Sequence, residues 1–285
     1  KGLKVVKLYP ATEVLSEVTL VNNDEFLYEL LASCKKSLSR KTKTAKTYFS
    51  LNTFVDSNQV ELLECYYNGV FRGYDLENLN LKNGRISLKP FNENYFVSLS
   101  TSRALTEHRL FEKNDYFPDS PLAMNRNSIE KEFFVQQDSK FKDASGRTVY
   151  AIKYKPKKET SYYFYGKAWI DSTSGNLLKV ELNSDSALIS PFAPLVPKDS
   201  LEKIAFRISK TYTLVGEKMY VKSIDFNYEL VYKSHRQGKY VVKSNAVLYA
   251  YNYQEEFLLP FYNVNSSALT DYRRITSAPY NVFFW

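Results

Sequence analysis

The clearest pattern along the chain is the alternation of apolar and polar side chains in its last third. The apolar residues Ile204, Phe206, Ile208, Tyr212 and Leu214 share one face, and polar residues occupy most of the positions between them. The same period of two returns over 220–230 and, after a turn at Gly238, over 240–251. Alternation of this length is typical of a long antiparallel strand with one buried face. The pattern therefore predicts three long, half-buried strands.

Shorter apolar runs upstream, separated by turn residues, predict hairpins. The predicted strand pairs are 47–55 with 60–67, 79–81 with 85–88, 130–141 with 149–154, and 162–170 with 177–182. The turns between them are rich in aspartate, asparagine, serine and glycine, and Asn83-Gly84 is the strongest hairpin signal among them. A proline-containing loop is expected over 184–200. The chain as a whole then holds about a dozen strands.

One helix is expected, over residues 22–40. Its apolar positions recur at helical spacing and form a single stripe, made of Phe26, Leu27, Leu30, Leu31, Cys34 and Leu38. A second, short helix is expected within 100–111. The fold class predicted is mainly β (α+β), with a large curved antiparallel sheet or half barrel and one main helix packed on its concave face. We expect 1–21 to be a linker or the end of a preceding β-sandwich domain, and 22–285 to be the half-barrel domain.

The helix stripe and the apolar face of the sheet are expected to meet. A rigid helix cannot follow a curved sheet along its whole length, so space can remain between them. If that space is large and dry it can take an acyl chain, and if side chains fill it the protein is a packed scaffold. The candidate ligand-binding residues are Leu27, Leu31, Phe206, Ile208, Ile224, Phe226 and Tyr228.

Aromatic residues are abundant, at 16% of the 285 residues, with 24 tyrosines and 19 phenylalanines, and glycine is scarce. This composition favours strands and argues against glycine-rich phosphate loops. Three aromatic residues, Tyr163, Tyr165 and Trp169, share one face of a predicted hairpin at a period of two. They form a possible stacking face for a sugar or a partner protein, and the alternative is that they pack against a neighbouring segment.

The net charge of +8 raises the question of nucleic acid or anionic membranes. The basic clusters are short, however, at 41–46 and 155–158, and both lie where turns are expected. No predicted helix carries a basic stripe. We therefore expect solvated lysines and no nucleic-acid partner. No apolar run is long enough for a transmembrane helix.

The sequence offers little catalytic chemistry. With two cysteines and two histidines, it contains no zinc-binding spacing, so neither a metal nor a cofactor is expected. His108 and His235 each precede an arginine, and neither has an evident carboxylate and nucleophile beside it. We expect both histidines at the surface, no catalytic residue and no enzymatic activity. Cys34 and Cys65 are expected as buried thiols, and a disulfide between them is left open.

The N-terminal segment resembles the last strands of the carboxypeptidase-like regulatory domain of Gram-negative envelope proteins. The matching positions are Val6, Leu8, Pro10, Leu15, Glu17, Val18 and Val21. The match covers less than a tenth of the chain and implies that the chain begins near the end of such a domain. Because the chain has neither an initiator methionine nor a signal peptide, Lys1 is expected to be an internal start.

A second stretch, 162–182, resembles a hairpin of the outer-membrane lipoprotein-sorting fold. The matching positions are Gly166, Trp169, Ile170, Asp171, Gly175, Leu178 and Lys179. Envelope proteins that combine both regions end in a segment similar to 271–285. The resemblance implies a half barrel whose cavity binds lipid or acyl chains, and a periplasmic or outer-membrane-associated location.

The function expected from these observations is that of a non-enzymatic cell-envelope module. It would bind a lipid, a lipoprotein, or a hydrophobic segment of an outer-membrane partner protein. Two alternatives remain open at this point. One is a structural interaction domain with a filled core, and the other is a glycan-binding module.

Overall fold

The computed structural model describes residues 24–91, 94–95, 99–158, 161–194, 196–258, 271 and 274–275. The expected domain end at 1–21, and with it the resemblance to the regulatory domain, lies outside these residues. So does most of the C-terminal segment 271–285.

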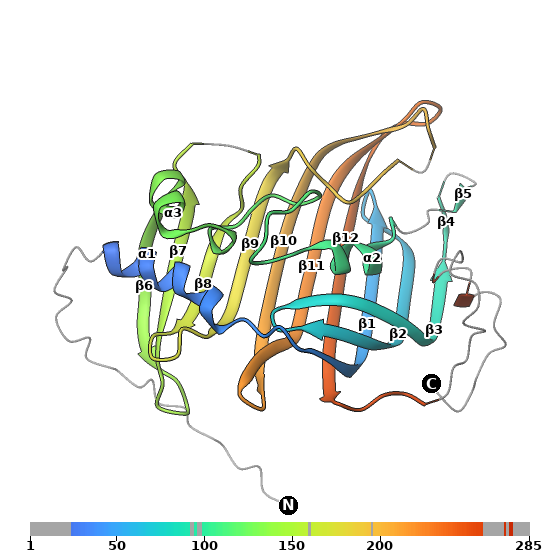
Figure 1. Ribbon diagram of the computed structural model, residues 1–285. Helices are drawn as coiled ribbons and strands as arrows, with labels where there is room; N and C mark the ends of the chain where they lie inside the picture. Colours follow the sequence, from blue (N-terminus) through green and yellow to red (C-terminus); the bar gives the residue numbers. More distant parts are fainter. Residues whose placement is uncertain are drawn as a thin grey trace, which may run out of the picture.

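One open antiparallel sheet of ten strands dominates the described chain (Figure 1). Its strands are β1 (Thr42–Val55), β2 (Asn58–Arg72), β3 (Asp75–Leu88), β6 (Phe133–Lys142), β7 (Thr148–Pro156), β8 (Tyr165–Asp171), β9 (Leu177–Ala187), β10 (Ser200–Val215), β11 (Lys218–Ser234) and β12 (Gly238–Tyr253). Their order is β3-β2-β1-β12-β11-β10-β9-β8-β7-β6. The short strands β4 (Pro90–Phe91) and β5 (Asn94–Tyr95) form a separate pair. The prediction of a mainly β protein is confirmed.

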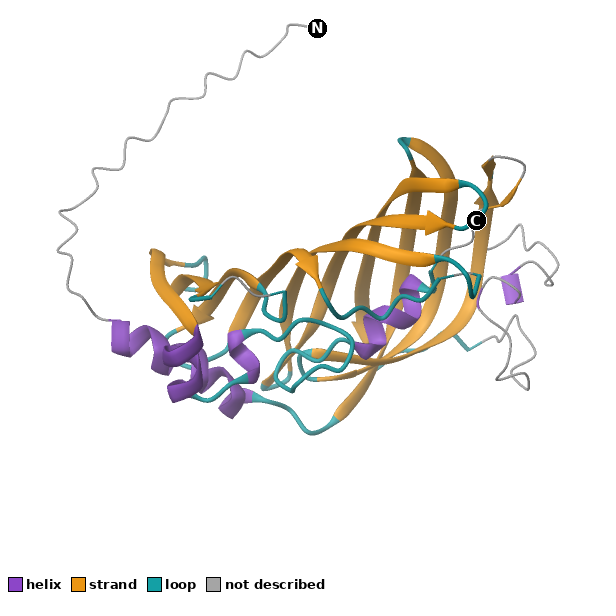
Figure 2. Cartoon of the chain, turned by 90° about the horizontal axis from the view of Figure 1, so that it is seen from above, coloured by secondary structure: helices purple, strands orange, loops and turns teal. Residues whose placement is uncertain are grey.

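Alternation explains the long strands β10, β11 and β12. Ile224 of β11 lies opposite Lys210 of β10 on one side and Leu248 of β12 on the other. On each of these strands, every second side chain shares the side of Ile224, Lys210 or Leu248. These side chains face the inside of the curved sheet and most are buried, and those between them face outwards. The sheet curves, and the helices lie on its inner side (Figure 2). We call these two sides the concave and the outer face.

The helical segments are short. They are α1 (Asp24–Ser33), the 3-10 turn η1 (Cys34–Ser37), α2 (Thr101–Glu107), the 3-10 turn η2 (Pro121–Ala123) and α3 (Arg126–Glu132). The expected helix over 22–40 is therefore present but ends earlier, at Ser33, and continues as a 3-10 turn. The short helix expected within 100–111 is α2.

Helix α1 covers a different part of the sheet from the one expected. It packs against α3, β6 and β8, at the end of the sheet remote from β1 (Figure 1). The Tyr28 hydroxyl donates to the Phe133 carbonyl at 3.2 Å, and the ring of Phe26 lies 5.2 Å from that of Tyr150. The apolar stripe is buried as predicted, with Leu31 fully inaccessible. An apolar stripe requires burial but does not specify a partner, and these two tyrosine contacts tie α1 to β6 and β7.

The hairpin expected at Asn83-Gly84 is wrong. Both residues lie inside the continuous strand β3, where Gly84 pairs with Cys65 of β2. A Cβ atom at Gly84 would lie 3.0 Å from the Cys65 sulfur, so this glycine permits a close approach of two strands and does not make a turn. The turn at Asp56-Ser57, by contrast, is confirmed between β1 and β2, with both residues at positive φ.

The placement of the basic clusters at turns is also wrong in part. Lys43 and Lys46 lie within β1, and Lys155 lies within β7. Lys46 pairs with Glu255 at 2.9 Å, which ties the end of β12 to β1. These lysines are thus spread along strands of a sheet rather than gathered at loop tips.

A glycine in β8 provides a test of the sheet packing. A Cβ atom at Gly166 would overlap the Glu181 carbonyl oxygen of β9, which also accepts the Tyr154 hydroxyl at 2.7 Å. We predict that Gly166→Ala lowers the free energy of unfolding by about 3 kcal/mol or more, because it separates β8 from β9 and breaks the tyrosine bond.

The matched control is Gly216→Ala, in the β10–β11 turn, where a Cβ atom would meet open space at a φ of +67°. Its expected cost is about 1 kcal/mol, from the left-handed backbone alone. Urea unfolding followed by circular dichroism measures both variants. Equal stability losses would contradict the account of Gly166.

Candidate functional site

An aromatic cluster occupies the concave face of the central strands. Phe206 of β10 and Phe226 and Tyr228 of β11 lie side by side on this face, with Phe206 and Phe226 ring centroids 5.9 Å apart. Rings from other segments pack on top of them. We call the whole set the aromatic cluster, and it consists of Phe117, Phe164, Phe192, Phe206, Phe226 and Tyr228. All six are buried.

The cover of this cluster is largely irregular chain. Phe117 lies between α2 and η2, 5.3 Å from Phe206. Phe192 lies in the loop that joins β9 to β10, 4.3 Å from Tyr228. Helix α2 adds one polar contact, between the hydroxyls of Thr101 and Tyr228 at 3.1 Å. Backbone hydrogen bonds of Asp119 hold the segment of Phe117 to Tyr162 and Phe164, at 2.8 and 2.9 Å. Irregular segments outside the main sheet open at lower cost than central strands do.

The structure brings together five of the seven predicted ligand-binding residues. Phe206, Ile208, Ile224, Phe226 and Tyr228 share the buried concave face of β10 and β11. Leu27 and Leu31 are buried too, but on α1, whose main contacts are with α3, β6 and β8. A ligand-binding role for these residues stays a prediction.

A buried polar cluster lies next to the aromatic cluster on the same face. Lys210 lies two residues after Ile208 on the same buried face of β10 and is 1% exposed. Its ammonium group lies 3.8 Å from the carboxylate of Asp75, at the start of β3. In the sheet order, β3 and β10 are separated by four other strands. Their meeting inside the sheet therefore reflects its curvature. Tyr74 and Tyr212 meet in the same way, with ring centroids 4.7 Å apart.

Two residues that follow α2 complete this cluster. Asp75 accepts the Leu110 N–H at 3.0 Å, and the partly exposed Arg109 donates to the Leu76 carbonyl at 2.9 Å. His108 is buried, with its ring 5.1 Å from that of Phe117. The expectation that His108 lies at the surface is wrong, because this ring packs edge-on against the aromatic cluster. We call Asp75, His108, Arg109, Lys210 and Tyr212 the polar cluster.

Burial and mutual charges set the protonation of the polar cluster. Burial lowers the pKa of Lys210 to about 8, with Asp75 opposing this shift and Arg109 adding to it. Burial raises the pKa of Asp75, and Lys210 opposes that shift. Burial, with Lys210 and Arg109 nearby, lowers the pKa of His108 well below its usual value. At pH 7 His108 is therefore neutral and Lys210 is mostly charged.

Three polar atoms of this cluster have no hydrogen-bond partner among the described residues. They are the Lys210 ammonium, the Tyr212 hydroxyl and Nδ1 of His108. Each such buried group costs about 1–3 kcal/mol when it is left unpaired. The sequence carried a signal for this site, because Lys210 interrupts the alternation at a position where an apolar side chain is expected.

The other histidine is held by a carboxylate that the sequence did not reveal. Nδ1 of His235 lies 2.7 Å from Asp199, which also accepts the Tyr232 hydroxyl at 2.8 Å. These bonds, above all that from the His235 side chain, lower the pKa of Asp199 to about 2. Nε2 of His235 accepts from Arg236 at 3.2 Å. His235 is at the surface as expected, and both ring nitrogens are engaged in structural contacts.

The three residues of the predicted stacking face, Tyr163, Tyr165 and Trp169, each contact other side chains of the protein. Tyr163 precedes β8, and its ring packs against that of buried Phe133 at 5.3 Å. Trp169 lies under the ammonium groups of Lys179 and Lys167, at 4.6 and 5.4 Å. Tyr165 donates to Asp185 at 3.0 Å. A sugar would have to displace lysines from the indole, and the use of these residues for binding remains untested.

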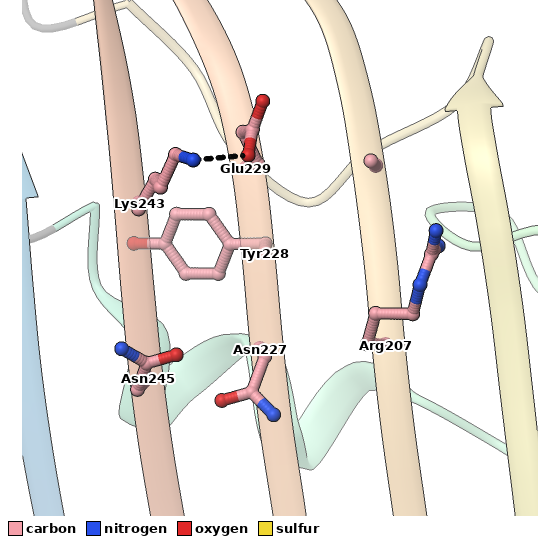
Figure 3. Close-up of a pocket in the computed structure, with 7 residues that line it drawn as sticks. Arg207, Asn227, Tyr228, Glu229, Lys243 and Asn245 are labelled. Atoms are coloured by element: carbon pink, nitrogen blue, oxygen red, sulfur yellow. Dashed lines mark ion pairs between the residues drawn. The ribbon is translucent and has the colours of Figure 1, made fainter. Parts of the chain in front are cut away.

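A shallow pocket on the outer face is lined by polar residues of β10, β11 and β12 (Figure 3). Its volume is about 210 Å³, below the usual range for ligand pockets. Its charges are already paired, Lys243 with Glu229 at 3.0 Å and Arg207 with Asp185. The pocket is therefore small, and its ion pairs leave no unpaired charge that would hold a ligand.

The described part of the chain contains no group of three metal-ligating side chains. Cys34 and Cys65 are both buried free thiols, so they form no disulfide with each other. Burial raises the pKa of the Cys34 thiol to about 12. These thiols act as small apolar side chains. Among the same residues, no helix has the length and apolar character needed to cross a membrane.

The polar cluster predicts a distinctive pH dependence of stability. The pKa of Lys210 is lower in the folded protein, at about 8, than the ordinary value of 10.5. Above pH 8 the folded state therefore binds fewer protons than the unfolded state, and this residue makes stability rise with pH. Relative to Lys210→Met, the native protein should gain about 1–2 kcal/mol between pH 7.5 and 9.5.

Urea unfolding of both proteins at several pH values measures this difference, and contributions from groups that do not interact with Lys210 cancel in the subtraction. Lys243→Met, on the outer face, is the control and should show no such gain. A constant difference between native protein and Lys210→Met would show that Lys210 is not charged and buried.

Comparison with known proteins leaves the family open. No protein-family model and no curated protein matches the chain. Solved structures with some likeness include a putative outer membrane lipoprotein-sorting protein domain from Vibrio parahaemolyticus, at 11% identity over 83% of this chain and 95% of that one, with a TM-score of 0.31. MucB has 8% identity over 79% of this chain and 92% of its own, with a TM-score of 0.27. A LolA superfamily protein from Nitrosomonas europaea has 9% identity over 81% of this chain and 94% of its own, also with a TM-score of 0.27. Likeness at this level carries no functional argument, so the function is argued from the described residues.

Proposed function

We propose that this protein binds an apolar ligand, such as an acyl chain, on the concave face of β10 and β11. The observation that supports this most is the nature of the cover over the aromatic cluster. Phe117 and Phe192 close the cluster from irregular segments, whereas Phe206 and Phe226 lie on central strands. A ligand could replace the covering rings without disturbing the hydrogen-bonded sheet.

The energetics of such an exchange are favourable in principle. Each methylene group that leaves water contributes about 0.8 kcal/mol, so ten contribute roughly 8 kcal/mol. Lifting a surface loop costs less than global unfolding. The rings of Phe192 and Tyr228 separate in this process, and their contact beyond simple burial is worth about 0.5–1.5 kcal/mol. A chain of medium length can therefore offset the cost of opening.

In this proposal the protein binds its ligand without catalysing a reaction, and it does so in the cell envelope. Burial lowers the pKa of His108 well below its usual value, which makes it a weak base, and both ring nitrogens of His235 are engaged in other contacts. A hydrophobic segment of a partner protein would use the same apolar surface. If the cover never opens, the chain is a structural domain with a filled core. The envelope location rests on the sequence resemblances alone.

Removal of one covering ring tests the proposal. Phe192→Ala should bind the neutral fluorescent probe N-phenylnaphthylamine about threefold to tenfold more tightly than the native protein, because the cluster opens at lower cost. The measurement is a fluorescence titration, with circular dichroism to verify the fold. Phe134→Ala is the matched control, since Phe134 is 61% exposed on the edge strand β6. The control should bind as the native protein does.

Two results would contradict the proposal. One is that neither the native protein nor folded Phe192→Ala binds the probe at all. The other is that Phe134→Ala changes binding as much as Phe192→Ala does, which would place the probe on the outer surface.

A further inference from the structure

The polar cluster has two hydrogen-bond donors that lack acceptors. The Lys210 ammonium lies 3.8 Å from Asp75, beyond hydrogen-bond distance, and the Tyr212 hydroxyl has no partner among the described residues. Both side chains leave the same face of β10, two residues apart, a spacing of about 7 Å along the strand. Asp75 acts electrostatically on both. Both donors thus belong to side chains on one buried face of β10, and neither has an acceptor among the described residues.

The charges of the cluster do not balance. Lys210 and Arg109 are the cations of the cluster and Asp75 is its carboxyl group, while His108 is neutral. Burial raises the pKa of Asp75, with Glu112 adding to that shift, and one carboxyl group does not neutralise two cations. The cluster itself therefore has an excess of positive charge in a buried setting, where an unpaired charge is costly. A singly charged anion neutralises it, whereas a phosphate dianion would leave an excess negative charge. The group that fits both the donors and the charge is a carboxylate.

The location of the cluster connects this charge to the apolar face. Lys210, Ile208 and Phe206 follow one another along the buried side of β10. The ring of His108 lies 5.1 Å from Phe117 and 6.1 Å from Phe164, both in the aromatic cluster. Arg109 is partly exposed and lies on the solvent side of the polar cluster. A molecule with its charged end at Lys210 would thus extend its apolar part over Ile208 and Phe206.

We propose that Lys210 and Tyr212, assisted by Arg109, bind the carboxylate of a fatty acid whose chain lies on the aromatic cluster. This inference rests on the proposed function and names the chemical class of its ligand. The ligand carboxylate would supply the hydrogen-bond acceptor that the Lys210 ammonium and the Tyr212 hydroxyl lack. It also explains why a lysine stands in the apolar series of β10.

The test compares two ligands that differ in charge. Decanoic acid and 1-decanol have chains of the same length, and displacement of N-phenylnaphthylamine at pH 7 measures both affinities. The native protein should bind the acid at least about tenfold more tightly than the alcohol, as expected for a charge-assisted hydrogen bond in a buried site. Inorganic phosphate should compete with neither ligand.

Three variants assign the preference to residues. Lys210→Met should bind acid and alcohol with similar affinity, with the alcohol affinity unchanged. Asp75→Asn removes the competing carboxylate and keeps an oxygen for the Leu110 N–H, so it should bind the acid more tightly. Lys243→Met, on the outer face in an ion pair with Glu229, is the control and should keep the native preference.

The outcomes separate this inference from the proposed function. If the native protein binds acid and alcohol equally well, the proposed function stands and the carboxylate site is wrong. If neither ligand binds, both are wrong. If Lys210→Met does not fold, the Asp75→Asn result decides, and an unchanged or weaker affinity for the acid would overturn the inference.

Discussion

The structure depends on one constraint, which is that a wide curved sheet with an apolar face has to bury that face. Long helices would cover it most simply, but the helices of the described chain are short, and α1 and α3 lie together near β6. The centre of the face is covered by aromatic rings carried on irregular segments. Large planar side chains suit this task, because each one buries much apolar surface from a single anchor point. In our proposal, the cover and the ligand site are therefore the same place.

Curvature has a second consequence, in the charges that it brings together. Because the sheet closes partly on itself, the beginning of β3 meets β10 although four strands lie between them. That meeting buries Asp75 and Lys210 beside each other without a direct hydrogen bond. Replacing both by apolar residues would remove a cost of burial, so their presence is not explained by stability. The proposed carboxylate site would account for the presence of the pair.

The sequence predicted the strands well where side chains alternate, as in β10, β11 and β12, since one buried face dictates a period of two. It failed at Asn83-Gly84, because glycine serves both turns and close strand contacts, and only the register with Cys65 tells which applies. The position of α1 could not be predicted, since its stripe specifies burial but no partner. Three of the six residues of the aromatic cluster, Phe206, Phe226 and Tyr228, follow from alternation, whereas Phe117, Phe164 and Phe192 lie outside the strands. The polar cluster does not, because Asp75, His108 and Lys210 are distant in sequence and meet only through curvature.

The central claim is that the cover over the aromatic cluster opens and that a ligand then occupies it. Hydrogen–deuterium exchange measured by mass spectrometry tests this directly, with and without 1-decanol. Our account predicts that residues 99–123 and the loop joining β9 to β10 exchange faster than β10 and β11 in the free protein, and that 1-decanol slows exchange in these two segments. Exchange in both segments as slow as in the central strands, and unaltered by 1-decanol, would contradict it.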